Sequence, residues 1–315
     1  MNKKIGTIVI AIIVILLGAT YFIKNKNSNE NTTSKESTIN ITHRYGETTV
    51  PKNPKRVVVL DYGSVDILDN MGIDIVGLPK SSIPNYLEKF KDDKYTDLGA
   101  LLEFSLEKIN ELKPDLIIIE GRQEKYYDEL SKIAPTIGLG TEKNDHFGSL
   151  KKNVNILGSI FEKEDFAKNQ LENIDKEVKE LNEQIKRENK NALVAMVNEG
   201  TISVFGQGSR FTTIYDEFGF NLADDKISDA KHGQNITYEY LLDKNPDYLF
   251  VIDKGVIVGN NQESAKDVIE KDIVKGTNAY KNNKIVYLTP ETWYLGGSGI
   301  TATNNMIKEI SNAIK

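Results

Sequence analysis

"SLEKINELKPDLIIIEGR", residues 105–122, is an amphipathic helix pattern followed by a Lys-Pro-Asp turn and a short run of apolar residues. A helix followed by a short buried strand is the repeating unit of a parallel α/β sheet. Proline disfavours helical geometry in the residue before it, so we expect the helix to end before Pro114. The same order recurs in "TYEYLLDKNPDYLFVIDK", residues 237–254.

The two stretches align without a gap, which indicates an internal repeat. At a constant offset of 132 residues the alignment pairs Glu107 with Glu239, Pro114 with Pro246, and Arg122 with Lys254. Units of this kind share composition, so part of the similarity reflects general βα sequence preferences. The coincidence of polar residues in register nevertheless favours two related α/β lobes.

A long helix separates the two copies. Its apolar residues recur at spacings of 3, 4, 3 and 4, namely Leu171, Ile174, Val178, Leu181 and Ile185. This is one apolar stripe on a helix of roughly 36 Å, and it is too short for a coiled coil. We therefore predict an α/β fold of two lobes with central, mostly parallel sheets, joined by a single long helix. The predicted segments are 1–23 (membrane or signal segment), 24–38 (flexible linker), 39–164 (first lobe), 165–189 (helix) and 190–315 (second lobe).

Composition excludes several functional classes. The 315 residues carry a net charge of −6 and include no cysteine. An acidic chain is a poor candidate for nucleic-acid binding, and without cysteine it forms no disulfide, thiolate zinc site or iron–sulfur cluster. The phosphate-binding loop, dinucleotide-binding, nucleophile-elbow and zinc-protease motifs are also absent from the sequence.

Three cations follow predicted strands and are candidates for ligand binding. Arg122 follows 116–119, Lys254 follows 249–252, and Arg210 follows a strand in "VFGQGSRF". Ligands of α/β sheets bind beyond the carboxyl ends of the strands. If the two lobes face each other, these side chains converge on one cleft and select an anion. Each of them taken alone is more typical of a solvated surface charge.

Histidines and aromatic residues provide further candidates. His43 falls in a predicted hairpin and is expected to be exposed, His146 lies near a helix start, and His232 sits in the loop "DAKHGQNIT". A lone histidine is more often structural, although it can complete the coordination sphere of iron(III) beside a phenolate. Trp293 and Tyr294 precede a glycine-rich turn, where an exposed pair would suit a flat aromatic ligand.

Six segments occur in the order seen in class III substrate-binding proteins of ABC importers: "GRQEKYYDEL", "FGQGSRF", "KHG", "NPDYLFVID", "VIVGN" and "PETWYL". Over roughly residues 45–315, the chain resembles most closely the ferric-catecholate siderophore receptors of the enterobactin and petrobactin type. The resemblance implies a bilobal fold with a rigid interlobe helix. It also implies an anionic ferric complex as ligand.

The resemblance also implies roles for single residues. Arg122 and Arg210 match arginines that hold catecholate oxygens, and Lys254 replaces a third arginine. Lysine keeps the charge but loses the planar bidentate fork, which leaves the siderophore preference open. His232 and Tyr294 match residues that bind iron when a tetradentate siderophore leaves two coordination positions open.

Two glutamates match a docking pair in the same family. Glu107 and Glu239 correspond to lobe-surface glutamates that dock onto arginines of the permease, one on each lobe. We therefore expect a monomeric, non-enzymatic receptor with no intrinsic cofactor, the ferric siderophore being its transported ligand and an ABC permease its partner. A haem- or corrinoid-binding protein of the same fold is an alternative, although a corrinoid would not need the cation cluster. A metal-dependent hydrolase would need a cluster of carboxylates and histidines, which the sequence does not show.

The N-terminus predicts how the receptor is held. Residues 5–23 are uncharged and would span roughly 28 Å as a helix, close to the thickness of a bilayer. Leu16-Leu17-Gly18 is followed by Ala19, where a lipoprotein signal has its lipid-bearing cysteine. Leu17 also fits a cleavage site poorly. We expect an uncleaved membrane anchor, a polar tether over 25–37 and an extracytoplasmic receptor, with a buried core helix as the alternative.

Overall fold

The computed structural model describes residues 37–142, 145–228, 232–258 and 263–315. The expected anchor at 1–23 lies outside these residues, as does most of the linker. Within the described residues, no helix has both the length and the hydropathy needed to cross a membrane. The fold below is that of the unit from Thr38 to Lys315.

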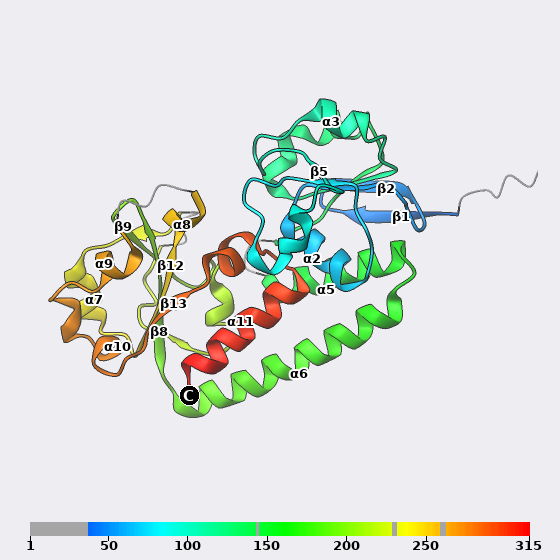
Figure 1. Cartoon of the computed structure of the whole chain (residues 1–315). Helices are drawn as coiled ribbons and strands as arrows, with labels where there is room; N and C mark the ends of the chain where they lie inside the picture. The colour runs from blue at the N-terminus through cyan, green and yellow to red at the C-terminus, as the bar shows by residue number, and fades with distance from the viewer. Residues whose placement is uncertain (1–36, 143–144, 229–231, 259–262) are drawn as a thin grey trace, which may run out of the picture. The chain divides into compact units, whose positions relative to one another are not determined.

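The N-terminal lobe is built on a five-stranded parallel sheet (Figure 1). In spatial order its strands are β5 (Thr96–Asp97), β4 (Gly77–Leu78), β3 (Val57–Val59), β6 (Leu116–Ile119) and β7 (Thr136–Gly138). Its helices are α2 (Tyr62–Asn70), α3 (Leu106–Glu111), α4 (Tyr127–Leu130) and α5 (His146–Ile160), with 3₁₀ turns at Asn85–Lys91 and Gly121–Tyr126. Strands β3, β6 and β7 are fully buried, as expected of a parallel sheet covered on both faces.

The C-terminal lobe has a six-stranded mixed sheet. Its strands are β11 (Gln234–Asn235), β9 (Thr201–Phe205), β8 (Asn191–Asn198), β12 (Tyr248–Asp253) and β13 (Ile285–Leu288) in that order, with β10 (Asn221–Leu222) paired to β8. Pairings among β10, β8, β12 and β13 are parallel, whereas β9 and β11 are antiparallel. Its helices are α7 (Tyr238–Lys244), α8 (Lys254–Val258), α9 (Ala265–Ile269), α10 (Asn278–Lys281) and α11 (Ile300–Ala313), with turns at Thr212–Ile214, Val274–Gly276 and Glu291–Leu295. The predicted α/β class with mostly parallel sheets is confirmed.

The repeated x-Pro-Asp turn performs the same task in both lobes. Lys113 and Asn245, which precede the prolines, both adopt left-handed backbone geometry, with φ of 45° and 44°. The Asp115 carboxylate accepts hydrogen bonds from the amides of residues 55 and 56, which lead into β3. Asp247 accepts in the same way from Asn191 at the start of β8. The motif thus ends a helix and fixes the start of the neighbouring central strand.

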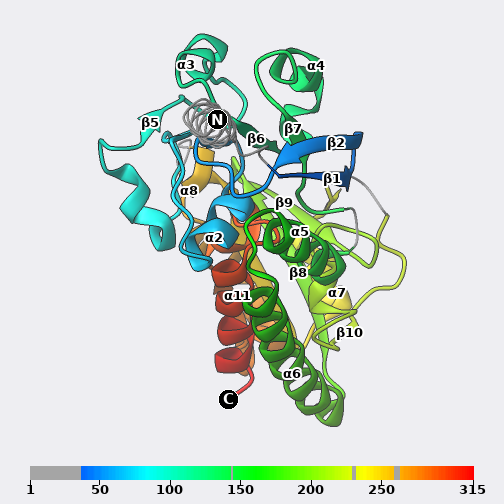
Figure 2. The same ribbon diagram turned by 90° about the vertical axis from the view of Figure 1, so that its right-hand side faces the viewer.

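Helix α6 (Glu164–Glu188) connects the two lobes. Four of the five predicted stripe residues are buried and Val178 is partly buried, so the stripe is confirmed. The stripe packs against α5 and α11, and α11 also packs against α2 of the first lobe (Figure 2). The C-terminal helix therefore returns to the N-terminal lobe, and one apolar core runs from the first sheet to the second.

A hairpin of β1 (Thr38–His43) and β2 (Gly46–Pro51) precedes the first sheet. The expectation that His43 is exposed was wrong, because only 5 % of it is accessible. Its ring accepts hydrogen bonds from the amides of Tyr45 and Gly138, which anchors the hairpin to β7. Burial, and secondarily the charge of Lys152, lowers the pKa of His43.

Candidate functional site

Arg122 stands on a loop that is fixed by hydrogen bonds. The chain leaves β6 at Glu120, whose amide donates to Gln123 Oε1 at 3.1 Å. Gln123 is fully buried, and its Nε2 donates to the carbonyl of Leu101 at 2.6 Å. The Tyr45 hydroxyl of the hairpin donates to the Glu120 carbonyl at 3.2 Å. These bonds hold the loop with little freedom, so the position of Arg122 is pre-organised.

Arg210 lies on the loop that follows β9 in the other lobe. Its neighbour Phe211 is buried, which anchors the loop, and the guanidinium carbon lies 5.3 Å from the centre of that ring. The same guanidinium lies 4.3 Å from the centre of the Tyr294 ring, an arrangement typical of a cation–π contact. Arg210 keeps accessible surface, but the surrounding protein desolvates its guanidinium. This desolvation, and then the charge of Arg122, lowers the pKa of Arg210.

Tyr294 brings the predicted cations together. Its carbonyl oxygen accepts a hydrogen bond from Arg122 Nη2 at 3.3 Å and another from Arg210 Nη2 at 2.9 Å. Lys254, the first residue of α8, places its Nζ 5.9 Å from the Tyr294 ring centre. The side chain of Tyr294 is itself partly exposed. Three cations and one phenol thus meet where the two lobes adjoin, as the strand-end argument predicts.

His232 stands apart from this cluster. It is exposed, and in the described part of the chain no hydrogen bond or ring contact joins it to Tyr294. Strand β11 begins two residues later and pairs Gln234 with Val204 of β9. Because the pairing is antiparallel, His232 lies beside the end of β9 from which the Arg210 loop departs. The structure therefore puts His232 at the same end of the sheet without an iron-binding contact.

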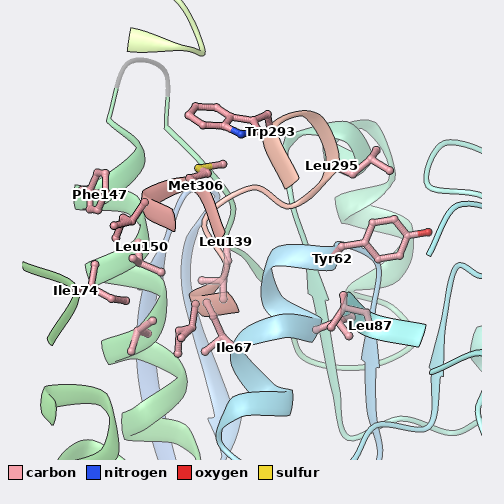
Figure 3. Packing of buried hydrophobic residues seen from close by; sticks show 14 of the residues in the cluster. Tyr62, Ile67, Leu87, Leu139, Phe147, Leu150, Ile174, Trp293, Leu295 and Met306 are labelled. Atoms are coloured by element: carbon pink, nitrogen blue, oxygen red, sulfur yellow. The ribbon is translucent and has the colours of Figure 1, made fainter. Parts of the chain in front are cut away.

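Trp293 differs from the expected exposed aromatic pair. Its indole is 5 % accessible, and Nε1 donates to Glu309 Oε2 of α11 at 2.6 Å. Figure 3 shows the ring beside Met306, on the opposite side of the turn from Leu295. Successive residues of a helical turn point about 100° apart, so Trp293 faces the core while Tyr294 faces outward. Its role as a ligand contact therefore has no support from this geometry.

Glu107 and Glu239 occupy equivalent exposed positions. Each is the second residue of a short helix, α3 and α7 respectively. The positive end of the helix dipole favours a carboxylate there, which alone explains their presence. Hydrogen bonding to Thr237 is the main cause that lowers the pKa of Glu239. The two sites are matched in local structure, as the repeat predicts.

Two carboxylates beside Arg122 escaped the sequence reasoning. Glu120 is 16 % exposed at its side chain and forms an ion pair with Arg122 Nη1. Asp61, at the start of α2, is buried, and burial followed by the charge of Glu120 raises its pKa to about 7. One signal was available in the repeat, because the residue aligned with Glu120 is Ile252. The aligned position therefore holds a carboxylate in one lobe and an isoleucine in the other. This difference indicates that the carboxylate has a specific role.

Hollows in the described surface lie away from the cation cluster. One of ≈ 560 Å³ runs between α6 and α11, lined by Leu181, Ile307 and polar side chains such as Glu177 and Lys308. It contains none of the predicted site residues. The cation cluster is therefore identified by its converging charges and hydrogen bonds rather than by the volume of a hollow.

The chain is similar to known proteins in both sequence and fold. Residues 57–292 match the family model for periplasmic binding proteins. The chain is 45% identical to the petrobactin-binding protein YclQ of Bacillus subtilis over 317 residues, which is 99% of each chain. The crystal structure of YclQ superimposes on this structure with a TM-score of 0.86 and covers 89% of this chain and 99% of the YclQ chain. It is 33% identical to the ferric-anguibactin-binding protein FatB of Vibrio anguillarum, over 87% of each chain. The catecholate-siderophore binding protein VctP of Vibrio cholerae is 37% identical, with a TM-score of 0.83 and coverage of 88% and 100%.

Proposed function

The chain belongs to the periplasmic binding protein family, and from this premise we propose that it binds ferric catecholate siderophores and delivers them to an ABC importer. The names of its relatives, which bind petrobactin, ferric anguibactin and catecholate siderophores, support this ligand class. The siderophore is cargo, and the protein performs no covalent chemistry on it.

One observation carries the proposal. Arg122 of the first lobe and Arg210 of the second both donate to the carbonyl oxygen of Tyr294. A ligand anion that offers several oxygens between the lobes would replace this single acceptor and satisfy both guanidiniums at once. Charge-assisted hydrogen bonds of this kind are among the strongest that a partly desolvated site offers. Lys254 adds a third positive charge near the Tyr294 ring.

Iron coordination is a second part of the proposal. The Tyr294 phenol is partly exposed and supplies a hard oxygen ligand for iron(III). His232 is the second proposed protein ligand of the metal, since it stands beside the end of β9 from which the Arg210 loop departs. A tetradentate siderophore leaves two coordination positions for these side chains, whereas a hexadentate one leaves none.

The proposal also covers how the receptor is held and what it meets. The N-terminal apolar segment anchors a monomer to the outer face of the membrane, and Glu107 and Glu239 dock onto basic residues of the permease. The anchor predicts that N-terminal sequencing of the native protein starts before residue 19. A start beyond that residue would contradict the anchor and leave the ligand proposal intact.

Fluorescence titration tests the ligand class. Trp293 is the single tryptophan of the chain, and energy transfer to a coloured ferric complex needs no direct contact. We expect ferric catecholates to quench its emission saturably. Arg210→Ala should weaken binding about 10- to 100-fold, the value of a hydrogen bond to a charged group. Arg187→Ala, which removes an exposed arginine of α6, is the matched control and should bind as the wild type does.

The same titration separates the roles of the iron ligands. His232→Ala should weaken a ferric tetradentate bis-catecholate by more than about tenfold, or about 1.4 kcal/mol, and leave a hexadentate tris-catecholate unaffected. Equal effects on both ligands would remove His232 from the coordination sphere. Absence of quenching by any ferric catecholate would contradict the proposed function itself.

A further inference from the structure

The cation cluster includes a carboxylate of the protein itself, Glu120, which competes with an anionic ligand for Arg122. Glu120 forms an ion pair with Arg122, and its side chain is only 16 % exposed. Hydrogen bonds to Tyr45 and Gln123 fix the backbone of Glu120. The Cβ and carboxylate of Glu120 lie so close to Gly140 that a side chain at position 140 would collide with them. The carboxylate therefore cannot move far from Arg122. An anion that draws Arg122 towards itself competes with Glu120 for the guanidinium and stays close to the negative charge of Glu120.

A second carboxylate lies behind the first. Asp61 is 4 % exposed, and its Oδ1 accepts from the Ser64 amide at 2.7 Å. Its Oδ2 is buried and has no hydrogen-bond partner among the described residues. A buried carboxylate oxygen without a donor favours the protonated form. The electrostatic influence of Glu120 on Asp61 adds to this preference.

Charged and titratable groups face the pair from several elements, and one of them is the Arg44 guanidinium of the hairpin, which lies against Gly121 next to Glu120. Arg122 faces both carboxylates, and Arg210 faces Glu120 from the second lobe. Tyr45 of the hairpin faces Glu120, and the buried Tyr86 of the turn at 85–91 faces Asp61. The turn at 296–298, which packs near Gly63 beside Asp61, contributes backbone and a serine but no charge. Arg122 is therefore the positive charge that Asp61 and Glu120 share.

We propose that Glu120 and Asp61 form a proton-accepting pair that takes up a proton when an anionic ligand draws Arg122 away from Glu120. The inference rests on the proposed function, because the anion is the ferric catecholate. The proton comes from the buffer and ends on a carboxylate oxygen of the pair. Loss of the shared guanidinium and arrival of ligand charge both favour the neutral acid. By linkage, binding tightens as pH falls, by at most about tenfold per pH unit for each proton taken up.

Calorimetry in two buffers of different ionisation enthalpy counts the protons directly. The probe is a ferric bis-catecholate at pH 7, because burial and the charge of Glu120 raise the pKa of Asp61 towards neutrality. Protonation of the pair on binding then appears as a net uptake of protons from the buffer, by at most about one proton per ligand bound. We expect Glu120→Gln to lower this uptake and to tighten binding about tenfold, because the competitor and its charge are gone. Asp61→Asn should also lower the uptake.

Glu124→Gln is the matched control. It removes an exposed carboxylate from the same turn and should keep the proton uptake of the wild type. Proton release or uptake by the ligand itself is common to all variants and cancels in the comparison. An equal proton count in the wild type and Glu120→Gln would overturn the inference, even if Asp61→Asn fails to fold. That outcome would leave the proposed function intact. Absence of binding by the wild type would overturn the proposed function and this inference with it.

Discussion

Tyr294 contributes to the site through its main chain as well as its phenol. Its carbonyl gathers Arg122 and Arg210 from two lobes, while its ring lies against Arg210. The adjacent Trp293 is fixed to α11 by its bond to Glu309, so the turn that carries Tyr294 is attached to the core. The two arginines are thereby kept near the positions from which they would meet an anion. This is pre-organisation, which lowers the entropic cost of binding.

His146 predicts a pH dependence of stability at the scale of a single residue. It is buried at the start of α5, with Nε2 3.0 Å from Thr303 Oγ1, and burial lowers its pKa to about 4. Between that value and the ordinary 6.5 the unfolded chain binds a proton that the folded one does not. Stability contributed by neutral His146 is therefore complete above pH 6.5 and is lost as pH falls towards 4, by about 3 kcal/mol.

Thermal unfolding of His146→Gln checks this dependence. Glutamine retains a polar partner for Thr303 but does not titrate, so its melting temperature should fall less than that of the wild type from pH 7 to pH 4.5. His232→Gln, at an exposed position, serves as control and should follow the wild type. Parallel profiles for the wild type and His146→Gln would exclude His146 as the cause.

At the scale of elements, we predict that the first turns of α3 and α7 dock onto the permease through Glu107 and Glu239. We expect Glu107→Lys and Glu239→Lys to leave ferric-siderophore affinity unchanged and to abolish uptake into cells, because charge reversal opposes basic residues on the permease. Loss of the favourable helix-dipole interaction should cost no more than about 1 kcal/mol. Fluorescence titration measures affinity, and radiolabelled iron uptake measures delivery.

Controls for docking come from the same helices. Glu111→Lys and Asp243→Lys reverse exposed charges at the other ends of α3 and α7. Uptake close to that of the wild type in these variants would assign the effect to the first turns. Uptake that falls equally in all four variants would instead reflect net charge.

The internal repeat shows which features of the structure could be predicted from the sequence. Local signals predict the helix, the Pro-Asp turn and the strand in both lobes, and the structure confirms all three. The left-handed geometry of Lys113 and Asn245 was not predicted and is a finding of the structure. Strand ends predict the convergence of Arg122, Arg210 and Lys254. The burial of Trp293 and the return of α11 to the first lobe depend on contacts between distant segments, which local periodicity does not encode. Glu120 and Asp61 were missed for the same reason, since their link is spatial.

At the scale of the whole molecule, α11 joins the lobes. Asp66 of α2 accepts hydrogen bonds from the amides of Thr301 at 3.1 Å and Ala302 at 2.9 Å, in the first turn of α11. The Gly299 position itself has no side chain to cap this helix, and a Cβ there would collide with the Asp66 carboxylate. A residue of the N-terminal lobe thus caps the C-terminal helix. Because one apolar core also spans both sheets, we expect the protein to unfold in a single cooperative transition.

Asp66→Ala tests this coupling. Loss of the cap should cost about 2 kcal/mol, which for a chain of this size lowers the melting temperature by about 3–4 °C. The transition should remain single, because the shared core persists. Affinity for the ferric siderophore should also fall, since the turn bearing Tyr294 leads directly into α11. Asp69→Ala, which breaks only a surface ion pair with Lys89, is the control and should change stability by no more than about 1 kcal/mol. Two separate calorimetric transitions in the wild type would show that the lobes are independent, and the interlobe helix would then be a tether rather than part of a common core.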